Sequence, residues 1–441
     1  MKKSIVAALV IVMVLSALAG CSGGGQEKPS NNAPDSSSSD KESPVSKKEI
    51  RISWWGSQSR HDLTMKALDL FMEKNPDIKV TAEFSGWDGY WDKLNVQTSG
   101  GNAPDLMQMH LSYLSNYVTR GLVADLSAAM DYSDVAESSL AIGKHEGGLY
   151  AIPAGLNSYV MMYNPALYEK AGITIDGRLT WDEFTANTKQ VAEKLGDGFY
   201  GSEDFSTEFG GFFEYFVRQK GENLYDGNQL GFTEETLAAW FQYWTDLRTE
   251  GVIPDAQLAN SYSLAEYEKT LLVTGKGPVK VDGSNQIGTY EKLANQPFEM
   301  MLYPTMDGGQ EGHALSAGIL WSINADSKHP EEVKKLLDFL THDPEAADIL
   351  GATRGVPISS NIRERLSASL NDADRKQFNI IDELSAVARP LNSNISPKGS
   401  AEVKELFENT AQSVQFGEMA PDAAAKKFVK EANDILSKQS D

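Results

Sequence analysis

The chain has 441 residues, of which 41% are hydrophobic and 9% aromatic, and its formal net charge is −22. This length suits two large lobes or two to three domains with an ordinary folded core. The acidic excess repels phosphate backbones and anionic headgroups, which argues against nucleic acid and against adhesive membrane binding. A single cysteine allows no internal disulfide, and six scattered histidines give no zinc-ligand spacing. We therefore expect no metal and no cofactor.

The first residues have the pattern of a secretory signal. A basic start, Met1-Lys2-Lys3, precedes an apolar stretch that ends at Leu18-Ala19-Gly20-Cys21 and is too short to span a membrane comfortably. The only cysteine stands at this point and resembles the lipobox cysteine of bacterial lipoproteins. The resemblance implies that residues 1–20 are removed and that Cys21 is acylated, which anchors the chain to the outer face of the cell membrane. An ordinary secreted protein is the alternative.

Residues 21–48 are rich in Ser, Gly, Asn, Asp and Lys and contain almost no apolar side chain. This composition predicts a disordered tether between the lipid and the folded body.

The folded body begins near residue 49 with alternating strands and helices. Apolar alternation predicts strands at 50–55, 78–84 and 106–109, and a one-sided apolar pattern predicts helices at 62–74 and 89–99. A strand–helix–strand series of this kind indicates a parallel sheet with helices on its faces.

The rest of the chain is mixed but has clear helix starts. Capping residues and prolines predict helices beginning at Asn164-Pro165, Thr180, Glu234, Pro330, Asp343-Pro344 and Pro421.

Aromatic and polar residues follow each of the first three predicted strands, in the segments Trp54 to Asp62, Gly86 to Trp91, and Met107 to His110. Loops beyond the carboxyl ends of strands line the ligand crevice of an open α/β sheet. Aromatic rings can bury the apolar face of a sugar, and Asp, Asn, Gln and Arg can bond its hydroxyls. The group therefore indicates a sugar site, although for any single tryptophan among them a core position is the favoured interpretation.

At this point the chain resembles the extracellular solute-binding proteins of carbohydrate ABC importers. The resemblance rests on Trp54-Trp55-Gly56, Gly101 to Leu106, Gly121 to Leu126, Tyr150 to Pro153, Thr180 to Phe184, Leu315 to Gly318 and Arg354 to Pro357. These motifs occur in the family's order and cover almost all of residues 49–436. The resemblance implies a two-lobed α/β fold of the periplasmic-binding-protein type II class, with the ligand cleft between the lobes. It suggests one lobe of 49–154 plus 313–357 and another of 155–312 plus 358–441.

The resemblance also implies the ligand contacts. They are Trp54, Trp55, Gln58 and Arg60 in the first loop, Trp87 and Asp88 in the second, Met109, His110, Asn157, Phe209, Asp282, Ser284, Asn285, Gly318, Trp321 and Arg354. Many sugar-binding relatives have aspartate where this chain has His110, and an exposed loop histidine is an equal alternative to a ligand contact there. Arg354 either reaches the cleft or makes a structural contact, and Phe209 suits a hydrophobic helix face as well as a ligand platform.

These expectations describe a receptor that captures an oligosaccharide, hands it to an ABC permease and performs no chemistry. We expect a monomer, and the same resemblance implies a Gram-positive cell. An extracellular glycoside hydrolase or lyase is the alternative, because 62 acidic residues leave a catalytic pair possible. No nucleophile elbow and no His-Glu-x-x-His helix supports it.

Overall fold

The computed structural model describes residues 47–261, 267–391 and 396–438, apart from the side chain of Asp88. The predicted signal, Cys21 and nearly all of the predicted tether lie outside these ranges. No helix in the described ranges combines the length and the apolar character that crossing a membrane would need.

A five-stranded sheet holds the first three strands, in the order β2-β1-β3-β12-β6. Its strands are β1 (Lys48–Trp55), β2 (Ile78–Ser85), β3 (Leu106–Met109), β12 (Leu320–Ile323) and β6 (Ile152–Pro153). β1 pairs in parallel with both β2 and β3, which confirms the parallel sheet predicted for these strands. β12 returns late in the chain and runs antiparallel to β3 and β6, so the complete sheet is mixed.

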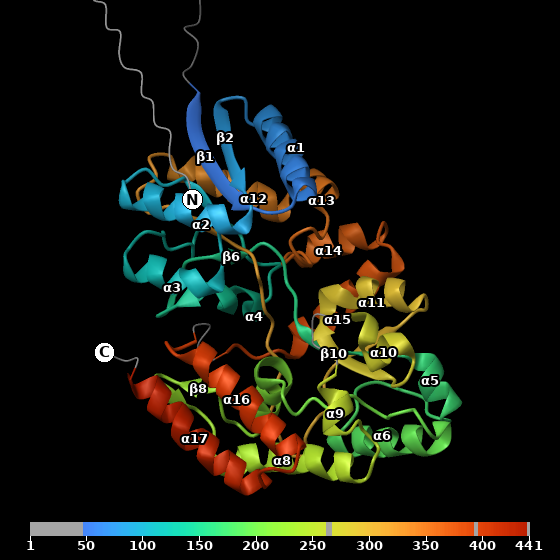
Figure 1. The fold of residues 1–441 in the computed structure, drawn as a ribbon. Coiled ribbons are helices and arrows are strands. Elements are labelled where there is room, and N and C mark those ends of the chain that lie inside the picture. The colour runs from blue at the N-terminus through green and yellow to red at the C-terminus, as the bar shows by residue number, and fades with distance from the viewer. Residues whose placement is uncertain (1–46, 262–266, 392–395, 439–441) are drawn as a thin grey trace, which may run out of the picture. The chain divides into compact units, whose positions relative to one another are not determined.

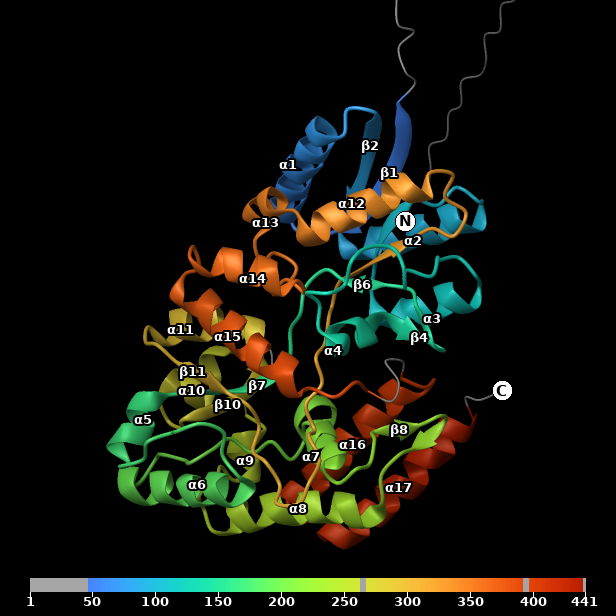
Figure 2. The ribbon, with the colours of Figure 1, turned by 180° about the vertical axis from the view of Figure 1, so that it is seen from behind.

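Helices cover both faces of this sheet. α2 (Trp87–Ser99) lies in front of the sheet in Figure 1, and α12 (Pro330–His342) lies in front of it when the molecule is seen from behind in Figure 2. α1 (Gln58–Lys74) and α13 (Pro344–Leu350) pack beside α12.

Two predicted helix starts were placed too late. Ser57 caps α1, since its side chain accepts from the Arg60 N–H, and helical structure therefore begins at residue 58 rather than 62. α2 begins at Trp87 rather than 89. Gln58, Arg60, Trp87 and Asp88 consequently lie in first helical turns and not in loops.

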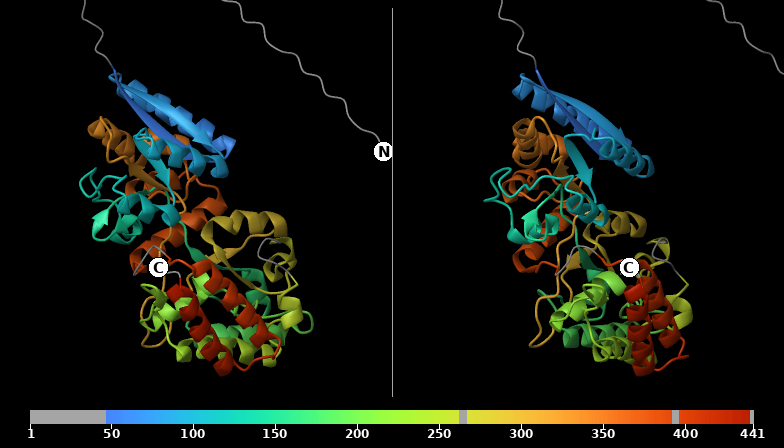
Figure 3. Two further views of the ribbon diagram at one scale, coloured as in Figure 1. Left: turned by 60° about the vertical axis from the view of Figure 1, so that its left-hand side comes forward. Right: turned by 90° about the vertical axis from the view of Figure 1, so that its left-hand side faces the viewer.

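A separate three-stranded antiparallel sheet has the order β10-β7-β11, with β7 (Tyr159–Tyr163), β10 (Val279–Gly283) and β11 (Glu299–Met301). Its surrounding core is strongly aromatic and contains Phe212, Trp240, Trp244, Phe407 and Phe428. The long helices α8 (Glu234–Thr249), α16 (Ser400–Gln415) and α17 (Pro421–Lys438) pack together there, and Figure 3 shows α16 and α17 side by side.

The other predicted helix starts are confirmed, and at two of them the predicted capping residues form the expected hydrogen bonds. Thr180 and Glu183 form the predicted capping box of α6 (Trp181–Leu195), and Asn164 caps α5 (Pro165–Lys170). The remaining elements are α3 (Leu111–Thr119), α4 (Glu137–Leu140), η1 (Ala141–Gly143), β4 (Lys144–His145), β5 (Gly148–Leu149), η2 (Phe209–Phe213), α7 (Glu214–Gln219), β8 (Tyr225–Asp226), β9 (Gln229–Leu230), α9 (Ala256–Ala259), η3 (Tyr267–Lys269), α10 (Leu271–Thr274), η4 (Ser284–Gln286), α11 (Ile287–Ala294), α14 (Ser360–Ser367) and α15 (Asp372–Val387).

Three stretches of chain run together between the two sheets. The N–H of Leu156 donates to the carbonyl of Val356 at 2.7 Å, and Asn157 and Ser316 exchange backbone bonds of 2.9 Å. Gly155 makes this approach possible, because a Cβ there would stand 2.5 Å from the Arg354 carbonyl oxygen. The three crossings are thus joined by backbone hydrogen bonds.

Candidate ligand-binding site

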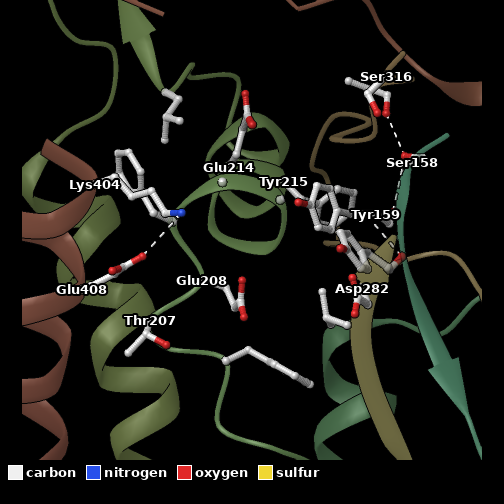
Figure 4. A pocket seen from close by; sticks show the side chains of 18 of the residues that line it. Ser158, Tyr159, Thr207, Glu208, Glu214, Tyr215, Asp282, Ser316, Lys404 and Glu408 are labelled. Atoms are coloured by element: carbon white, nitrogen blue, oxygen red, sulfur yellow. Dashed lines mark hydrogen bonds and ion pairs between the residues drawn. The ribbon is translucent and has the colours of Figure 1, made fainter. Parts of the chain in front are cut away.

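A cavity of about 920 Å³ opens beside the three-stranded sheet, next to the crossings (Figure 4). Asp282 of β10 and Tyr159 of β7 meet at one end of this sheet because the two strands are antiparallel. Ser158 and Ser316 bring the crossings to the wall, and Lys404 and Glu408 of α16 form the opposite side.

The turn η2 and the start of α7 supply two carboxylates to the cavity. Glu208 precedes η2 and Glu214 opens α7, while Gly210 and Gly211 between them leave helical geometry. Gly211 has φ 93°, which side-chain-bearing residues rarely adopt. The two glycines therefore let the chain reverse so that both carboxylates face the same space.

Aromatic rings make up much of the wall. The Tyr159 ring is half exposed and lies 3.4 Å from where a Cβ on Gly211 would stand. The Tyr215 hydroxyl accepts from Arg178 at 2.6 Å and donates to the Pro304 carbonyl at 2.8 Å, so its ring is held in place. Phe209, Tyr225 and Tyr303 also line the cavity. Such rings offer flat apolar surface bordered by hydroxyl groups.

Two buried ion pairs stand behind this surface. Lys280 Nζ lies 3.0 Å from Glu203 Oε2, and both side chains are at most 5% exposed. Although burial pushes the pKa of Lys280 down, attraction to Glu203 and Glu208 raises it above its ordinary value. Arg248 donates to Asp204 through two nitrogens, at 2.6 and 2.9 Å.

Glu208 and Glu214 differ from these paired acids. Burial raises the pKa of Glu208, and the charges of Glu203 and Asp282 add to this effect against the attraction of Lys280. Burial also raises the pKa of Glu214, against the attraction of Arg218. Within the described residues, neither side chain has an ion-pair partner within 4.0 Å.

The chemistry of this cavity suits a polyhydroxylated ligand. Carboxylates and tyrosine oxygens accept hydrogen bonds from hydroxyl groups, and the rings cover apolar C–H faces. No group of three or more His, Cys, Asp or Glu side chains in the described part of the chain has metal-binding geometry.

The comparisons with known proteins identify the family. The model of the bacterial extracellular solute-binding proteins matches residues 66–374. A solved extracellular solute-binding protein family 1 from Alicyclobacillus acidocaldarius is 31% identical, with a TM-score of 0.82, over 88% of this chain and 98% of that one. This chain belongs to the bacterial extracellular solute-binding proteins. The two-lobed α/β fold expected from the sequence is thereby confirmed.

Two further relatives of this solute-binding protein have named ligands. A maltooligosaccharide ABC transporter solute-binding lipoprotein of Streptococcus pneumoniae is 25% identical over 73% of this chain and 77% of that protein. A periplasmic oligogalacturonide binding protein from Yersinia enterocolitica is 26% identical, with a TM-score of 0.76, over 89% of this chain and 99% of that one.

Two of the residues expected at the site lie in the cavity of this solute-binding protein. Phe209 is a wall residue, and its buried ring also packs on Phe407 with centroids 4.7 Å apart. Asp282 accepts from the Tyr290 hydroxyl at 2.7 Å, which leaves oxygen lone pairs for a ligand.

A second group of expected residues forms an aromatic cluster at the ends of the first strands. Trp55 is nearly buried and meets Trp87 edge to face at 5.0 Å, and Trp87 meets His110 in the same way at 5.4 Å. Trp87 is 41% exposed and so presents a ring to solvent. Burial lowers the pKa of His110, and its Nδ1 caps α3 by accepting from Ser112.

A third group is enclosed in the core of the five-stranded sheet. Trp54 and Met109 are fully buried, and Trp321 is nearly so. Arg354 is 8% exposed, donates to Gln108 and Thr64 and lies over the Trp321 ring at 5.2 Å. Burial lowers the pKa of Arg354 to about 9. The sequence left open whether Arg354 reaches the cleft or makes a structural contact, and the contacts described here are structural.

The other expected residues are dispersed outside the cavity lining, with the following contacts and exposure. Arg60 donates to the Thr353 carbonyl, Gln58 bonds Asp62 on α1, Asn157 accepts from Gln377, Ser284 is buried against Ser158, Asn285 and Gly318 are exposed, and the Asp88 side chain lies outside the described part of the structure.

Sequence reasoning missed Tyr159, Glu208, Glu214, Tyr215 and Lys404, which line the cavity. One signal was present, since two adjacent glycines separate two aromatic-flanked glutamates at 208–214. Tyr215 directly follows Glu214, whereas Tyr159 and Lys404 come from two distant stretches of chain that only the fold brings to this turn.

Proposed function

We propose that this protein is a lipid-anchored receptor that captures an oligosaccharide and delivers it to the permease of an ABC importer. The observation that carries the proposal is the cavity of about 920 Å³ with tyrosine walls and open carboxylates. Ligand pockets typically span about 300–1,000 Å³, so this cavity has room for several sugar rings. The named ligands of the pneumococcal and Yersinia relatives support the same class.

Capture would involve closure about the three crossings, as in other two-lobed binders. The proposed lobes are residues 49–154 plus 313–357 and residues 155–312 plus 358–441. α15 packs on both α11 and β11, which supports placing it in the second lobe, although its buried Phe378, Ile380, Ile381 and Leu384 join the core of the five-stranded sheet. Closure would bring the exposed Trp87 ring onto a sugar held in the cavity.

The proposal is tested by calorimetry and thermal unfolding with a panel of defined oligosaccharides. Bound ligand raises the melting temperature by mass action, so a matching sugar gives both heat and a shift. Tyr159→Ala should weaken that binding, and Phe416→Ala, which removes an exposed ring that does not line the cavity, should not. Failure of every oligosaccharide to bind would overturn the proposal. Chromatography of the incubated sugar distinguishes a receptor from a glycosidase, because a receptor returns it uncleaved.

Anchoring through Cys21 remains part of the proposal, with the outer face of the cell membrane as its location and a monomer as its form. The lipoprotein name of the pneumococcal relative supports it. Cys21→Ser should prevent acylation and release the protein from washed membranes, while Ser22→Ala should leave it attached. Retention of the Cys21→Ser protein on membranes would contradict the anchor.

A further inference from the structure

The charges lining the cavity are unbalanced toward acid. Six carboxylates line it, from Glu203, Asp204, Glu208, Glu214, Asp282 and Glu408, against the cations of Arg218, Lys280 and Lys404. Arg248 already pairs with Asp204, and even if each of the three lining cations neutralised one further acid completely, two negative charges would remain on the described wall.

The cations are also committed elsewhere. Lys280 pairs with Glu203 at 3.0 Å, and Lys404 lies 3.7 Å from Glu408. Arg218 donates to the backbone carbonyls of Gly312 at 2.8 Å and Arg389 at 2.7 Å, which holds its guanidinium against the chain. None of the three lies within ion-pairing distance of Glu208 or Glu214 in the described structure.

Glu208 and Glu214 therefore present carboxylates that lack a counter-charge in a partly desolvated space. They line the cavity from the two ends of the same short turn, and in Figure 4 the two carboxylates point in different directions. Asp282 lies on the facing strand, and its charge adds to the repulsion at Glu208. An ionised carboxylate only accepts hydrogen bonds. A ligand that binds this wall must therefore supply hydrogen-bond donors, and positively charged donors make the strongest bonds.

We propose that the ligand is an amino sugar oligomer whose free ammonium groups are held at Glu208 and at Glu214. This inference rests on the proposed function, because it takes the cavity as the sugar site. An ammonium group supplies three N–H donors and the missing positive charge. A uronic acid would bring a further negative charge against the same wall, so acidic sugars such as the named ligand of the Yersinia relative are disfavoured here.

Calorimetry with four matched probes tests the inference. They are a glucosamine tetramer, its N-acetylated counterpart, a maltotetraose and a galacturonate tetramer. The free amine should bind about 10- to 100-fold more tightly than the N-acetyl form, the effect of one charged hydrogen bond. The galacturonate should be the weakest ligand.

Variants locate the effect. Glu208→Gln and Glu214→Gln keep the shape of each side chain but remove its charge, so each should reduce the preference for the free amine over the N-acetyl form. Glu418→Gln, on an exposed turn between α16 and α17, should leave that preference unchanged. Equal or tighter binding of the neutral or acidic tetramer, or a preference that survives both cavity variants, would overturn the inference while leaving the proposed function intact. Binding of none of the four tetramers would also overturn the inference, whereas the proposed function is overturned only when the whole oligosaccharide panel fails to bind.

Discussion

The buried pair behind the cavity offers the sharpest test of the electrostatic reasoning. Lys280→Met removes an ammonium group 3.0 Å from Glu203 Oε2 and leaves that carboxylate, 3% exposed, with the Leu271 N–H as its remaining partner at 2.9 Å. Breaking a buried pair from one side costs about 3–5 kcal/mol, because the remaining charge has lost its solvation and its partner. We expect Lys280→Met to lower the free energy of unfolding by that amount.

The double variant separates this cost from lost packing. In Glu203→Gln with Lys280→Met, the glutamine carbonyl still accepts from Leu271, and both members of the ion pair are replaced by neutral side chains. Its stability should lie within about 1–2 kcal/mol of the unmodified protein, since neutral replacements of buried pairs are often tolerated. Lys430→Met serves as the exposed control, because Lys430 and Asp434 are 76% and 55% exposed, and it should leave the free energy of unfolding unchanged within error.

Denaturant unfolding followed by tryptophan fluorescence measures these differences. Trp240 and Trp244 are fully buried in the same aromatic core and report its loss directly. A cost below about 1 kcal/mol for Lys280→Met, or a double variant as unstable as the single one, would refute the reasoning.

Three further outcomes follow from the geometry. Trp87→Ala should weaken oligosaccharide binding by about 1–3 kcal/mol in calorimetry and leave the fold intact, because the ring is 41% exposed, and Phe416→Ala at 55% exposure should not. An unchanged affinity in the Trp87→Ala variant would show that this ring does not contact the ligand. Burial lowers the pKa of His313 to about 3, so only the unfolded chain binds this proton between pH 6.5 and 3. Stability should therefore fall by about 1.4 kcal/mol per pH unit as the pH drops through that window, and His313→Gln should lose this component in thermal melts; parallel melting profiles would contradict it. Gly211→Ala, at φ 93°, should cost about 1–3 kcal/mol in unfolding experiments, whereas Gly210→Ala, with φ −90° and no atom within 4 Å of its added Cβ, should cost far less. Equal costs would show that backbone strain is not the reason.

The sequence predicted correctly those strands and helix starts that are determined by the residues within the element itself. Alternation in 50–55 and 78–84 predicted β1 and β2, and Thr180 with Glu183 predicted the start of α6. It failed at α1 and α2, whose starts at Ser57 and Gly86 precede the apolar pattern. Apolar periodicity marks only the part of a helix that is buried, and the first turn of each of these helices extends beyond that part.

The candidate site shows the same division. A strand end followed by tryptophans indicated correctly that aromatic rings gather there, since Trp55, Trp87 and His110 are in contact. It did not separate Trp54, which is fully buried, from Trp87, which is 41% exposed. Alternation assigns a side chain to a face of the sheet, but what covers that face is decided by helices distant in sequence.

By itself the sequence determined the family, the α/β class and the order of the main elements, because capping, alternation and motif order are local properties. Only the tertiary structure decided the cavity, because its walls come from segments between Ser158 and Gln412. Pairing in that wall is equally non-local, since Lys280 neutralises Glu203 from 77 positions away. The packing of distant segments therefore decides which carboxylates lack an ion-pair partner and can bind a ligand. The composition alone does not predict this.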